Sequence, residues 1–352
     1  MLTNKKVLLG MSGGVDSSVS ALLLKEKGYD VIGTTLELFA GSSCCNINTY
    51  IDAKNVCNSI GIPHFTYDCK EQFRKQVIED FINCYSNQLT PNPCIECNKY
   101  MKFGYMYEKA KELGCDYIAT GHYAKMEYSE KYGRYVIKKS NNIAKDQSYV
   151  LYPMPKELLG KVLFPLGEFS SKEEVRNIAK EKNLKVANKP DSEDICFVPD
   201  GNYKKFLENN SELKPIEGNI VNSKGAILGK HKGLYYYTIG QRRGLGISNK
   251  VPLFVIGFNR EKNELIVGEE NELYKDEMLV GNVNLLAIDE IKGKLKVSVK
   301  TRYSSKEEKA DIEMLDNGLI KVKFEQKVAR ITPGQAAVFY DDDIVIGGGT
   351  IL

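Results

Sequence analysis

The sequence predicts an α/β domain, with helices on both faces of a parallel sheet, followed by two small β-rich or barrel domains. In the first half, strand-like apolar runs at 7–11, 31–36 and 117–120 alternate with helix-like segments. Strands separated by helices of this length pair in parallel. After about residue 203, short β-branched runs and turn signals such as NSKG at 222–225 replace the helical pattern. We therefore expect three domains, at residues 1–203, 204–275 and 276–352.

Each element is predicted from the spacing of its apolar residues. Residues 17–27 are expected to form a helix, because Val19, Leu22 and Leu23 recur at helical spacing. The other elements expected in the first half are helices at 50–60, 71–87 and 102–113 and a strand at 64–67. The strands expected in the second half lie at 219–221, 251–258, 264–268, 294–300, 319–324, 336–340 and 344–346. Short strands at this spacing are typical of small barrels.

Composition limits the class of protein. The chain has 352 residues, of which 42% are hydrophobic and 27% charged, as in a soluble protein of two or three domains. It has no apolar run of about 18 residues, and residues 1–6 lack the features of a signal peptide, so we expect a cytoplasmic protein without a membrane span. Its nine cysteines are then better explained by catalysis or metal binding than by secreted disulfides. The net charge of +3 leaves the partner open.

The strongest single motif is GMSGGVDSS at residues 10–18, between a predicted strand and a predicted helix. Glycines let the backbone turn tightly and bring N–H groups close to an anion, and the helix N-terminus adds a favourable dipole. Asp16 would orient this loop or help to hold Mg²⁺. The motif lacks the Gly-Lys-Ser/Thr ending of a P-loop and resembles the SGGxDS loop of N-type ATP pyrophosphatases; the alternative is a β–α turn without a ligand. The loop residues expected to bind ATP are Gly10, Met11, Ser12, Gly13, Gly14, Val15, Asp16 and Ser17.

Three cysteines stand out, Cys94 and Cys97 in NPCIEC and Cys196 in DSEDICF. Prolines 91 and 93 predict an extended loop that brings Cys97 to the start of the helix expected at 102–113. A thiol near a helix N-terminus and near lysines is a good nucleophile. A role for Cys44 and Cys45, after the second strand, stays open. The remaining cysteines are interpreted as small core residues: Cys57, Cys69, Cys84 and Cys115.

Several motifs, in order, resemble those of the tRNA-specific 2-thiouridylases over essentially the full length of the chain. They are the ATP loop, NPC and CN at 92–98, ATGHY at 119–123, KDQSY at 145–149, FPLG at 164–167, CF at 196–197, TIGQRRGLG at 238–246, KTRY at 300–303 and TPGQ at 332–335. The resemblance implies an N-type ATP pyrophosphatase domain, and an ATP-dependent sulfurtransferase that acts on tRNA.

The resemblance implies a reaction in two stages. ATP converts the C2 oxygen of the wobble uridine into an adenylate, so that AMP can leave, and sulfur then replaces it to give 2-thiouridine. Cys196 is implied as the persulfide carrier and Cys97 as the nucleophile that resolves it, which leaves a disulfide between them. A persulfide donor protein, either a cysteine desulfurase or a relay, is implied as a partner.

The chain departs from many members of that family at Cys94, where they carry Asp. Together with Cys97 and Cys196, this third thiolate could hold a [4Fe-4S] cluster with one open iron. The alternatives are a small buried residue in place of Asp, a redox pair, or zinc, which lacks a fourth ligand in the sequence. The residues alone leave the cluster and the persulfide route open.

Gly121 and His122 follow a predicted strand whose carboxyl end faces the crevice where ligands bind in open α/β sheets. His122 could hydrogen-bond the RNA, or could be a satisfied structural histidine. The resemblance adds Gly121 to the ATP site and Leu36 to its adenine pocket, and makes QRRG at 241–244 a further candidate for RNA contact. The residues it implies as tRNA contacts are Asn92, Pro93, Cys94, His122, Lys145, Asp146, Gln147, Arg302, Tyr303 and Gln335.

Two other functions compete with this one. The chain could be an ATP pyrophosphatase that adenylates a small molecule, or a non-catalytic nucleotide- and RNA-binding sulfur carrier. The β-rich half, the three cysteines and residues 145–147 argue against the first of these. Pyrophosphate release that depends on unmodified tRNA would separate all three.

Overall fold

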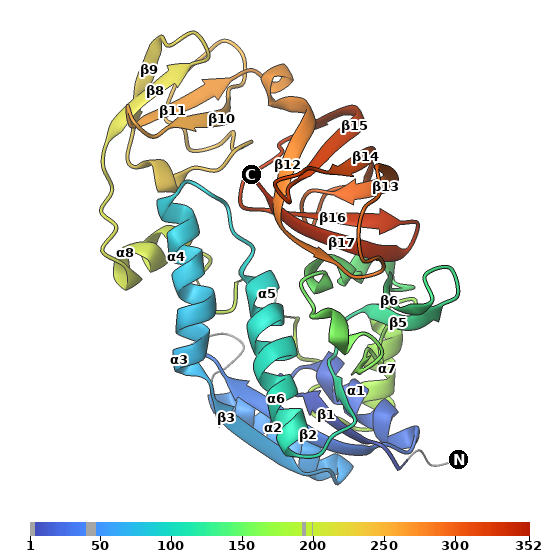
Figure 1. Cartoon of the computed structure of the whole chain (residues 1–352). Helices are drawn as coiled ribbons and strands as arrows, with labels where there is room; N and C mark the ends of the chain where they lie inside the picture. Colours follow the sequence, from blue (N-terminus) through green and yellow to red (C-terminus); the bar gives the residue numbers. More distant parts are fainter. Residues whose placement is uncertain (1–3, 40–46, 192–194, 199) are drawn as a thin grey trace.

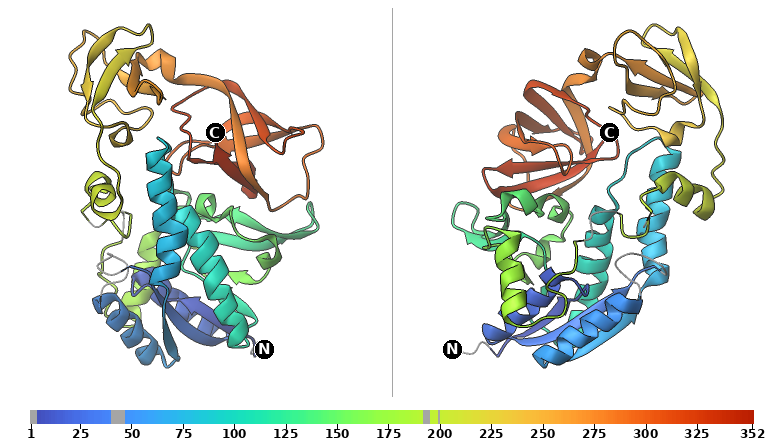
Figure 2. Two further views of the ribbon diagram at one scale, coloured as in Figure 1. Left: turned by 60° about the vertical axis from the view of Figure 1, so that its left-hand side comes forward. Right: turned by 180° about the vertical axis from the view of Figure 1, so that it is seen from behind.

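The computed structural model describes residues 4–39, 47–191, 195–198 and 200–352. A parallel sheet with its helices forms one end of the molecule and a four-stranded sheet forms the other, with a barrel lying beside them (Figures 1 and 2). No helix in these ranges is long and apolar enough to cross a membrane. The ribbon therefore shows an α/β unit and two β units, as the sequence predicts.

The first unit is built on a five-stranded sheet with the strand order β3-β2-β1-β4-β7, in which every pairing is parallel. Side chains of β1 alternate between two cores. Leu8 packs with Phe103 and Met106 on one face, whereas Val7 and Leu9 pack with helices α1, α2 and α7 on the other. Helices therefore cover both faces, as predicted. The elements are β1 (Lys6–Gly10), α1 (Val15–Glu26), β2 (Asp30–Glu37), α2 (Ile47–Ile60), β3 (His64–Asp68), β4 (Tyr117–Ala119), β7 (Val162–Leu163) and α7 (Lys172–Glu181).

Two long helices, each containing a π-helical stretch, carry most of the remaining helical residues. One runs through α3 (Lys70–Phe73), η1 (Arg74–Ile78) and α4 (Glu79–Ser86). The other runs through α5 (Pro93–Glu96), η2 (Cys97–Tyr105) and α6 (Met106–Glu112). π-Helical turns inside longer helices are frequent at functional sites.

The extended loop predicted up to Cys97 is wrong, because the helix begins at Pro93. Asn92 caps it by accepting a hydrogen bond of 3.2 Å from the amide of Cys94. Proline is favoured at the first position of a helix, where its missing N–H costs nothing. Cys97 consequently lies in the second turn, so that the helix N-terminus is closer to Cys94 than to Cys97.

The β-rich half contains more strands than predicted. After α8 (Tyr203–Asn210), four strands pair in the order β10-β11-β8-β9: β8 (Gly218–Asn222), β9 (Ile227–His231), β10 (Phe254–Asn259) and β11 (Glu264–Gly268). Six more form a barrel that is closed by the pairing of β12 with β17. They are β12 (Tyr274–Leu285), β13 (Lys294–Lys300), β14 (Glu308–Met314), β15 (Ile320–Ala329), β16 (Ala336–Asp341) and β17 (Ile344–Ile351).

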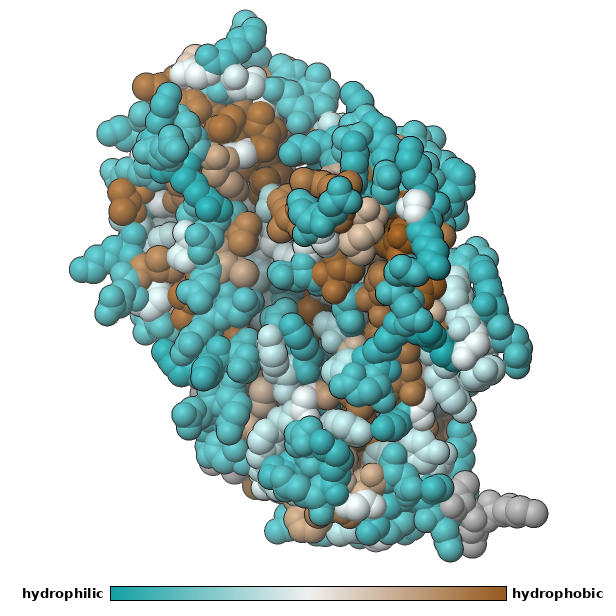
Figure 3. Space-filling view, in the orientation of Figure 1, coloured by the Kyte–Doolittle hydropathy of each residue, from teal (hydrophilic) through white to brown (hydrophobic). Residues whose placement is uncertain are grey.

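The predictions missed strands β9, β12 and β14, which carry many polar residues. β9 is an edge strand on which Ile227 and Leu228 are exposed and only His231 is buried, so that it lacks an alternating apolar face. In β14 only Ala310 and Ile312 are buried. Hydrophobic side chains on the viewed face gather in its upper half, over the four-stranded sheet and the barrel (Figure 3).

A hairpin from the first half of the chain extends the barrel sheet. It consists of β5 (Ala124–Ser129) and β6 (Arg134–Lys139), and β6 pairs with β17 at Lys138 and Ile344. The contact continues through Tyr149, whose hydroxyl donates to the carbonyl oxygen of Ala336 over 2.9 Å. The α/β unit and the barrel therefore share backbone and side-chain hydrogen bonds.

Candidate active site

The predicted ATP loop lies at the carboxyl end of β1, in the middle of the parallel sheet, and leads into α1. Gly13 has a φ of 64°, and a Cβ atom there would lie 2.5 Å from the carbonyl oxygen of Thr49, so that only glycine fits. The amide of Ser12 donates to Oγ of Ser17 over 3.2 Å. In the described chain no side chain caps α1 at Gly14, which leaves the first N–H groups of the helix available to an anion.

Gly121 and Leu36 are the other residues expected at the ATP site. Leu36 lies on β2 and Gly121 lies two residues after β4, and β2 and β4 are the strands that flank β1. A Cβ atom on Gly121 would lie 3.0 Å from the amide nitrogen of Ser17, so the residue after β4 approaches the start of α1 closely. Leu36 lies near the end of β2 and is paired with Tyr67 of β3. Both residues are therefore at the loop edge of the sheet.

Asp16 is held by two neighbours. The Lys172 ammonium donates to both of its carboxylate oxygens, at 2.6 and 2.7 Å, and the Tyr123 hydroxyl donates to one of them over 2.9 Å. Burial, and then the charge of Asp16, raise the pKa of the Tyr123 hydroxyl, so that it remains a donor. Mg²⁺ bound to Asp16 would have to replace the Lys172 contact.

A second carboxylate, Asp191, collects three cations beside the loop. Lys172 lies 3.0 Å from it, Arg176 3.0 Å and Lys145 3.2 Å. Burial opposes ionisation of Asp191, yet the lysines hold the pKa of its carboxyl below the ordinary value. This carboxylate therefore ties the segment after α7 to the ATP loop.

The sequence predictions missed three cations around the loop. Lys172 and Arg176 are four residues apart on α7, a spacing that puts both on one face of the helix. Lys189 donates to the carbonyl oxygen of Gly13 over 3.0 Å and pairs with Asp52. The Lys-x₃-Arg spacing was the available signal, but it shows nothing until the fold brings α7 beside α1.

His122 is buried between the rings of Phe103 and Phe164. Its Nε2 lies 3.3 Å from the Lys102 ammonium and its Nδ1 lies 2.8 Å from Oγ1 of Thr120. An ammonium can only donate, so Nε2 accepts and Nδ1 carries the proton. Burial, and then the charge of Lys102, hold the pKa of His122 well below its usual value, so the imidazole is neutral.

The three residues of the KDQ segment lie beside the ATP loop. Asp146 is buried, and its carboxylate accepts hydrogen bonds from the Ser140 amide at 2.9 Å and the Ser148 hydroxyl at 2.7 Å. Gln147 accepts from the amide of Tyr123 over 2.9 Å. Asp146 and Gln147 therefore hold the backbone in place, while the half-exposed Lys145 lies nearest to solvent.

The cysteines divide into a pair and a single residue. Cys97 and Cys196 are half-buried and pack on the same hydrophobic cluster, which includes Phe81 and Phe197. Cys94 is exposed and lies near Tyr303 of the barrel. Burial, and then the charges of Asp146 and Cys94, raise the pKa of the Tyr303 hydroxyl. The fold therefore brings Cys97 and Cys196 to one region and leaves Cys94 on the side of the barrel.

The three cysteines do not form a metal site in this arrangement. Over the described ranges, no three Cys, His, Asp or Glu side chains are grouped so that they could hold a metal ion. Cys94, Cys97 and Cys196 all lie within those ranges, so they do not fit a [4Fe-4S] cluster or zinc in this conformation.

The other cysteines match their predicted role as core residues where the structure describes them. Cys57 and Cys69 are fully buried, and Cys84 and Cys115 are half-buried. Burial raises the pKa of the thiols of Cys57 and Cys84 to about 12, which makes them poor nucleophiles. Residues 44 and 45 lie outside the described ranges.

The barrel is fastened to the segment that precedes the cysteine helix. Nε2 of Gln335 donates to the carbonyl oxygens of Thr90, at 2.8 Å, and Pro91, at 3.3 Å. The amide of Thr90 donates back to Pro333 over 2.9 Å. A Cβ atom on Gly334 would lie 2.7 Å from that same amide, so only glycine allows this approach. We call residues 332–335 and 90–91 together the barrel dock.

Arg302 continues the connection to the four-stranded sheet. Its guanidinium donates to the hydroxyl of Thr332 and, over 3.1 Å, to the carbonyl oxygen of Ile239. Its neighbour Tyr303 is 43% exposed, with its ring 6.1 Å from that of Tyr149. Of these two predicted RNA contacts, Arg302 is engaged within the protein and Tyr303 faces solvent.

The regions of the chain match three families in order. Residues 5–200 match the tRNA methyl transferase HUP domain, residues 204–269 the tRNA methyl transferase PRC-barrel domain, and residues 275–351 the aminomethyltransferase β-barrel domain. The tRNA-specific 2-thiouridylase MnmA of Clostridioides difficile (strain 630) is 48% identical over 100% of this chain and 99% of its own length. The one from Caldicellulosiruptor saccharolyticus is 48% identical over 99% and 98%. The chain belongs to the tRNA-specific 2-thiouridylase family.

The family predicted from the motifs is therefore confirmed. Among solved structures, this member of the 2-thiouridylase family is similar to the U34-tRNA thiolase NcsA from Methanococcus maripaludis, over 59% of this chain and 68% of that one. The TM-score is 0.38 and the sequence identity 21%, so this similarity adds nothing about the site.

We predict that His122 is the neutral Nδ1–H tautomer throughout the range of pH 6 to 8. His231 provides an internal control, because the Gly233 amide donates to its Nδ1 over 3.1 Å, which leaves the proton on Nε2. Nitrogen NMR of the two imidazoles should show opposite tautomers. Lys102→Met should raise the pKa of His122, but not above its ordinary value, because burial is the larger cause. A His122 protonated at pH 6 would contradict this assignment.

The same depressed pKa gives the sign of a stability change. As pH falls below about 6.5, the unfolded chain binds a proton at His122 and the folded chain does not, so the free energy of unfolding decreases. Lys102→Met should make this decrease smaller.

We predict that Gln335→Ala loosens the barrel dock. Loss of its two hydrogen bonds, at about 1 kcal/mol each, should speed exchange of the Thr90 amide roughly 30-fold, measured by hydrogen–deuterium exchange of the peptide that contains it. Gln241→Ala is the matched control, because its amide donates to the backbone of Arg243 within its own turn. Unchanged exchange in the Gln335 variant would show that this side chain does not hold the dock.

Proposed function

We propose that this chain is an ATP-dependent tRNA 2-thiouridylase. It adenylates the C2 oxygen of the wobble uridine and replaces that oxygen with sulfur, which yields 2-thiouridine. The observation that carries the proposal is the loop at 10–18, an uncapped helix N-terminus surrounded by lysine and arginine, in a chain that belongs over its whole length to this family. The work takes place in the cytoplasm, where tRNA is available.

The first stage uses the loop and its cations. The phosphates of ATP lie against the N–H groups at the start of α1, and Lys172, Arg176 and Lys189 neutralise their charge. Asp16 would hold the Mg²⁺ that accompanies ATP if Lys172, which now donates to its carboxylate, turned to a phosphate instead. The uridine oxygen attacks the α-phosphate and pyrophosphate leaves, so C2 now carries AMP as a good leaving group.

The second stage uses Cys97 and Cys196. A persulfide donor protein loads a sulfur atom onto Cys196, and its terminal sulfur attacks C2 and expels AMP with the original oxygen. The Cys97 thiolate then attacks the Cys196 sulfur, which releases the thiocarbonyl on the uridine and forms a disulfide between the two cysteines. An external thiol reduces that disulfide for the next turnover. The shared hydrophobic cluster of the two residues supports this pairing.

The remaining predicted site residues support substrate binding in this proposal. Lys145, beside the ATP loop, and Tyr303, on the barrel, are exposed, and RNA would approach there. His122 is buried, so it would act on the RNA only through Lys102, whose ammonium its Nε2 accepts from. Asn92 and Pro93 set the position of Cys94 at the start of the helix. We propose three domains, at residues 1–203, 204–275 and 276–352, and the first contains the ATP loop together with Cys94, Cys97 and Cys196.

We predict that Asp16→Ala lowers tRNA-dependent AMP release by about 100-fold or more, because a phosphate-site group that acts in the transition state is lost. Asp116→Ala is the matched control. Asp116 also pairs with a lysine, Lys5, over 2.8 Å, but it lies just before β4, at the amino ends of the strands and away from the ATP loop. With a persulfide donor supplied, control and wild type should release AMP alike, and only when unmodified tRNA is present. AMP release without tRNA would point instead to a small-molecule adenylating enzyme.

We predict that Cys97→Ala and Cys196→Ala each lower 2-thiouridine formation by roughly 1,000-fold or more while tRNA adenylation continues. Cys94→Ala should keep most of the activity, since no step above requires that thiol, and Cys115→Ala serves as the control for loss of a half-buried thiol. The assay uses a persulfide donor and anaerobically prepared enzyme with its iron content measured. Joint loss of iron and activity in all three active-site variants would restore the cluster hypothesis.

A further inference from the structure

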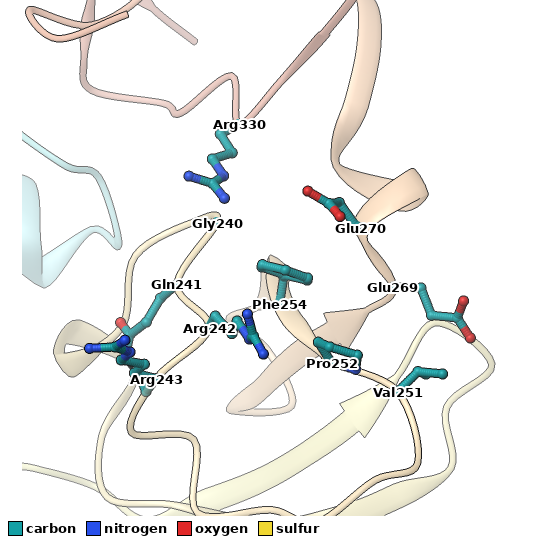
Figure 4. A pocket seen from close by; sticks show the side chains of 10 residues that line it. All are labelled: Gly240, Gln241, Arg242, Arg243, Val251, Pro252, Phe254, Glu269, Glu270 and Arg330. Atoms are coloured by element: carbon teal, nitrogen blue, oxygen red, sulfur yellow. The ribbon is translucent and has the colours of Figure 1, made fainter.

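A hollow of about 620 Å³ lies where the four-stranded sheet meets the barrel, and we call it the seam hollow (Figure 4). Three arginines line it, Arg242 and Arg243 from the turn before β10 and Arg330 from the end of β15. Phe254, Glu269 and Glu270 also contribute. None of these residues belongs to the ATP loop or to the cysteine region described above.

Arg330 is held in an unusual conformation that presents it to the hollow. Its φ is 63°, in the left-handed region that a residue other than glycine adopts at a cost of about 1 kcal/mol or more. Gly240, with a φ of 86°, lies under the side chain, and a Cβ atom there would be 2.8 Å from Cγ of Arg330. The guanidinium carbon lies 6.0 Å from the centre of the Phe254 ring. Backbone and packing therefore fix the direction of this arginine.

The other two arginines are presented by a turn that is internally braced. The side-chain oxygen of Gln241 accepts from the Thr238 amide over 3.2 Å, and its nitrogen donates to the carbonyl oxygen of Arg243 over 2.9 Å. The Gly240 amide donates to Val255 of β10 over 2.8 Å. The turn is thus anchored to the sheet, while the side chains of Arg242 and Arg243 are exposed.

The positive charge of these arginines is not neutralised within the protein. Over the part of the chain that the structure describes, none of the three forms an ion pair. A fourth, half-buried arginine lies nearby: burial, and then the charge of Arg330, lower the pKa of Arg302. Like charges placed together without a counter-ion favour an anionic ligand.

One carboxylate opposes this charge. In Figure 4 the side chain of Glu270 is directed toward Arg330 across the hollow, whereas Glu269 points away from it. The hollow is thus lined by three arginines and by two glutamates, of which only Glu270 is directed across it, so its net character is positive.

We propose that the seam hollow binds the sugar–phosphate backbone of the tRNA substrate, at a distance from the uridine that reacts. The ligand is a polyanion rather than a base, because Arg330 covers the Phe254 ring, which is 6% exposed and offers no open face for stacking. Exposed arginines from two different units suit an extended backbone, in which successive phosphates are contacted, better than one small enclosed anion. This inference rests on the proposed function, since it takes tRNA as the substrate.

The test measures the Kd of unmodified tRNA by filter binding over a series of KCl concentrations. Arg242→Gln and Arg330→Gln should each lower the log–log salt slope by about one and raise Kd roughly 3- to 10-fold. Glu270→Gln should lower Kd, because it removes a charge that repels phosphate. Lys294→Gln, which removes an exposed charge from the start of β13, is the matched control and should leave both quantities unchanged.

The outcomes separate the alternatives. An unchanged salt slope in both arginine variants overturns the proposal. A second result also overturns it: inorganic phosphate displaces tRNA from wild type but not from Arg330→Gln, at an ionic strength at which KCl displaces none, because the hollow would then be a site for a small anion. If Arg330→Gln unfolds at a lower temperature than wild type, Arg242→Gln decides alone, because its side chain is exposed. Wild-type enzyme that binds tRNA with the expected slope but releases no AMP would refute the proposed function and leave the seam hollow standing.

Discussion

The cysteine helix has a fixed starting point because the barrel dock holds the chain just before it. Gln335 binds the carbonyl oxygens of residues 90 and 91, and Asn92 then caps the helix whose first turns contain Cys94 and Cys97. Helix position in turn decides which hydrophobic cluster Cys97 joins, and Cys196 is part of that cluster. A contact made by the segment between the last strands of the chain therefore sets the position of a pair of residues in the α/β unit.

The second constraint is electrostatic. Asp16 and Asp191 share Lys172, while Lys145 and Arg176 also pair with Asp191, so three cations face two carboxylates beside an uncapped helix N-terminus. The surplus of positive charge adds to the helix dipole, and both favour a polyphosphate. Because Lys172 bridges the two carboxylates, a ligand that draws it away from Asp16 also changes the environment of Asp191. Phosphate binding and the position of the segment after α7 are thereby coupled.

The sequence was informative wherever a local pattern determines the structure. The alternation of apolar runs predicted the parallel sheet, and the glycines at 13 and 14 predicted the loop. The start of the cysteine helix was missed because two prolines suggest a loop, whereas a capping Asn92 makes Pro93 a good first residue. Lys172 and Gln335 could not be placed from sequence, since their partners Asp16 and Thr90 are 156 and 245 residues away along the chain. Long-range contacts of this kind depend on the packing of whole units.

Two positive regions at different ends of the molecule impose a geometric condition on a rigid substrate. The ATP loop lies in the α/β unit and the seam hollow at the junction of the other two units. Arg302 joins the barrel to the loop before β10, and the barrel dock joins the barrel to residues 90–91 of the α/β unit. If tRNA contacts both regions, as we propose, the distance between them sets its register, and only a nucleotide at the matching position along its backbone would reach Cys97 and Cys196. Phosphate contacts carry no sequence information by themselves. Spaced along a rigid protein, however, they select a position, and the choice of uridine then depends on the shape of the tRNA as well as on its bases.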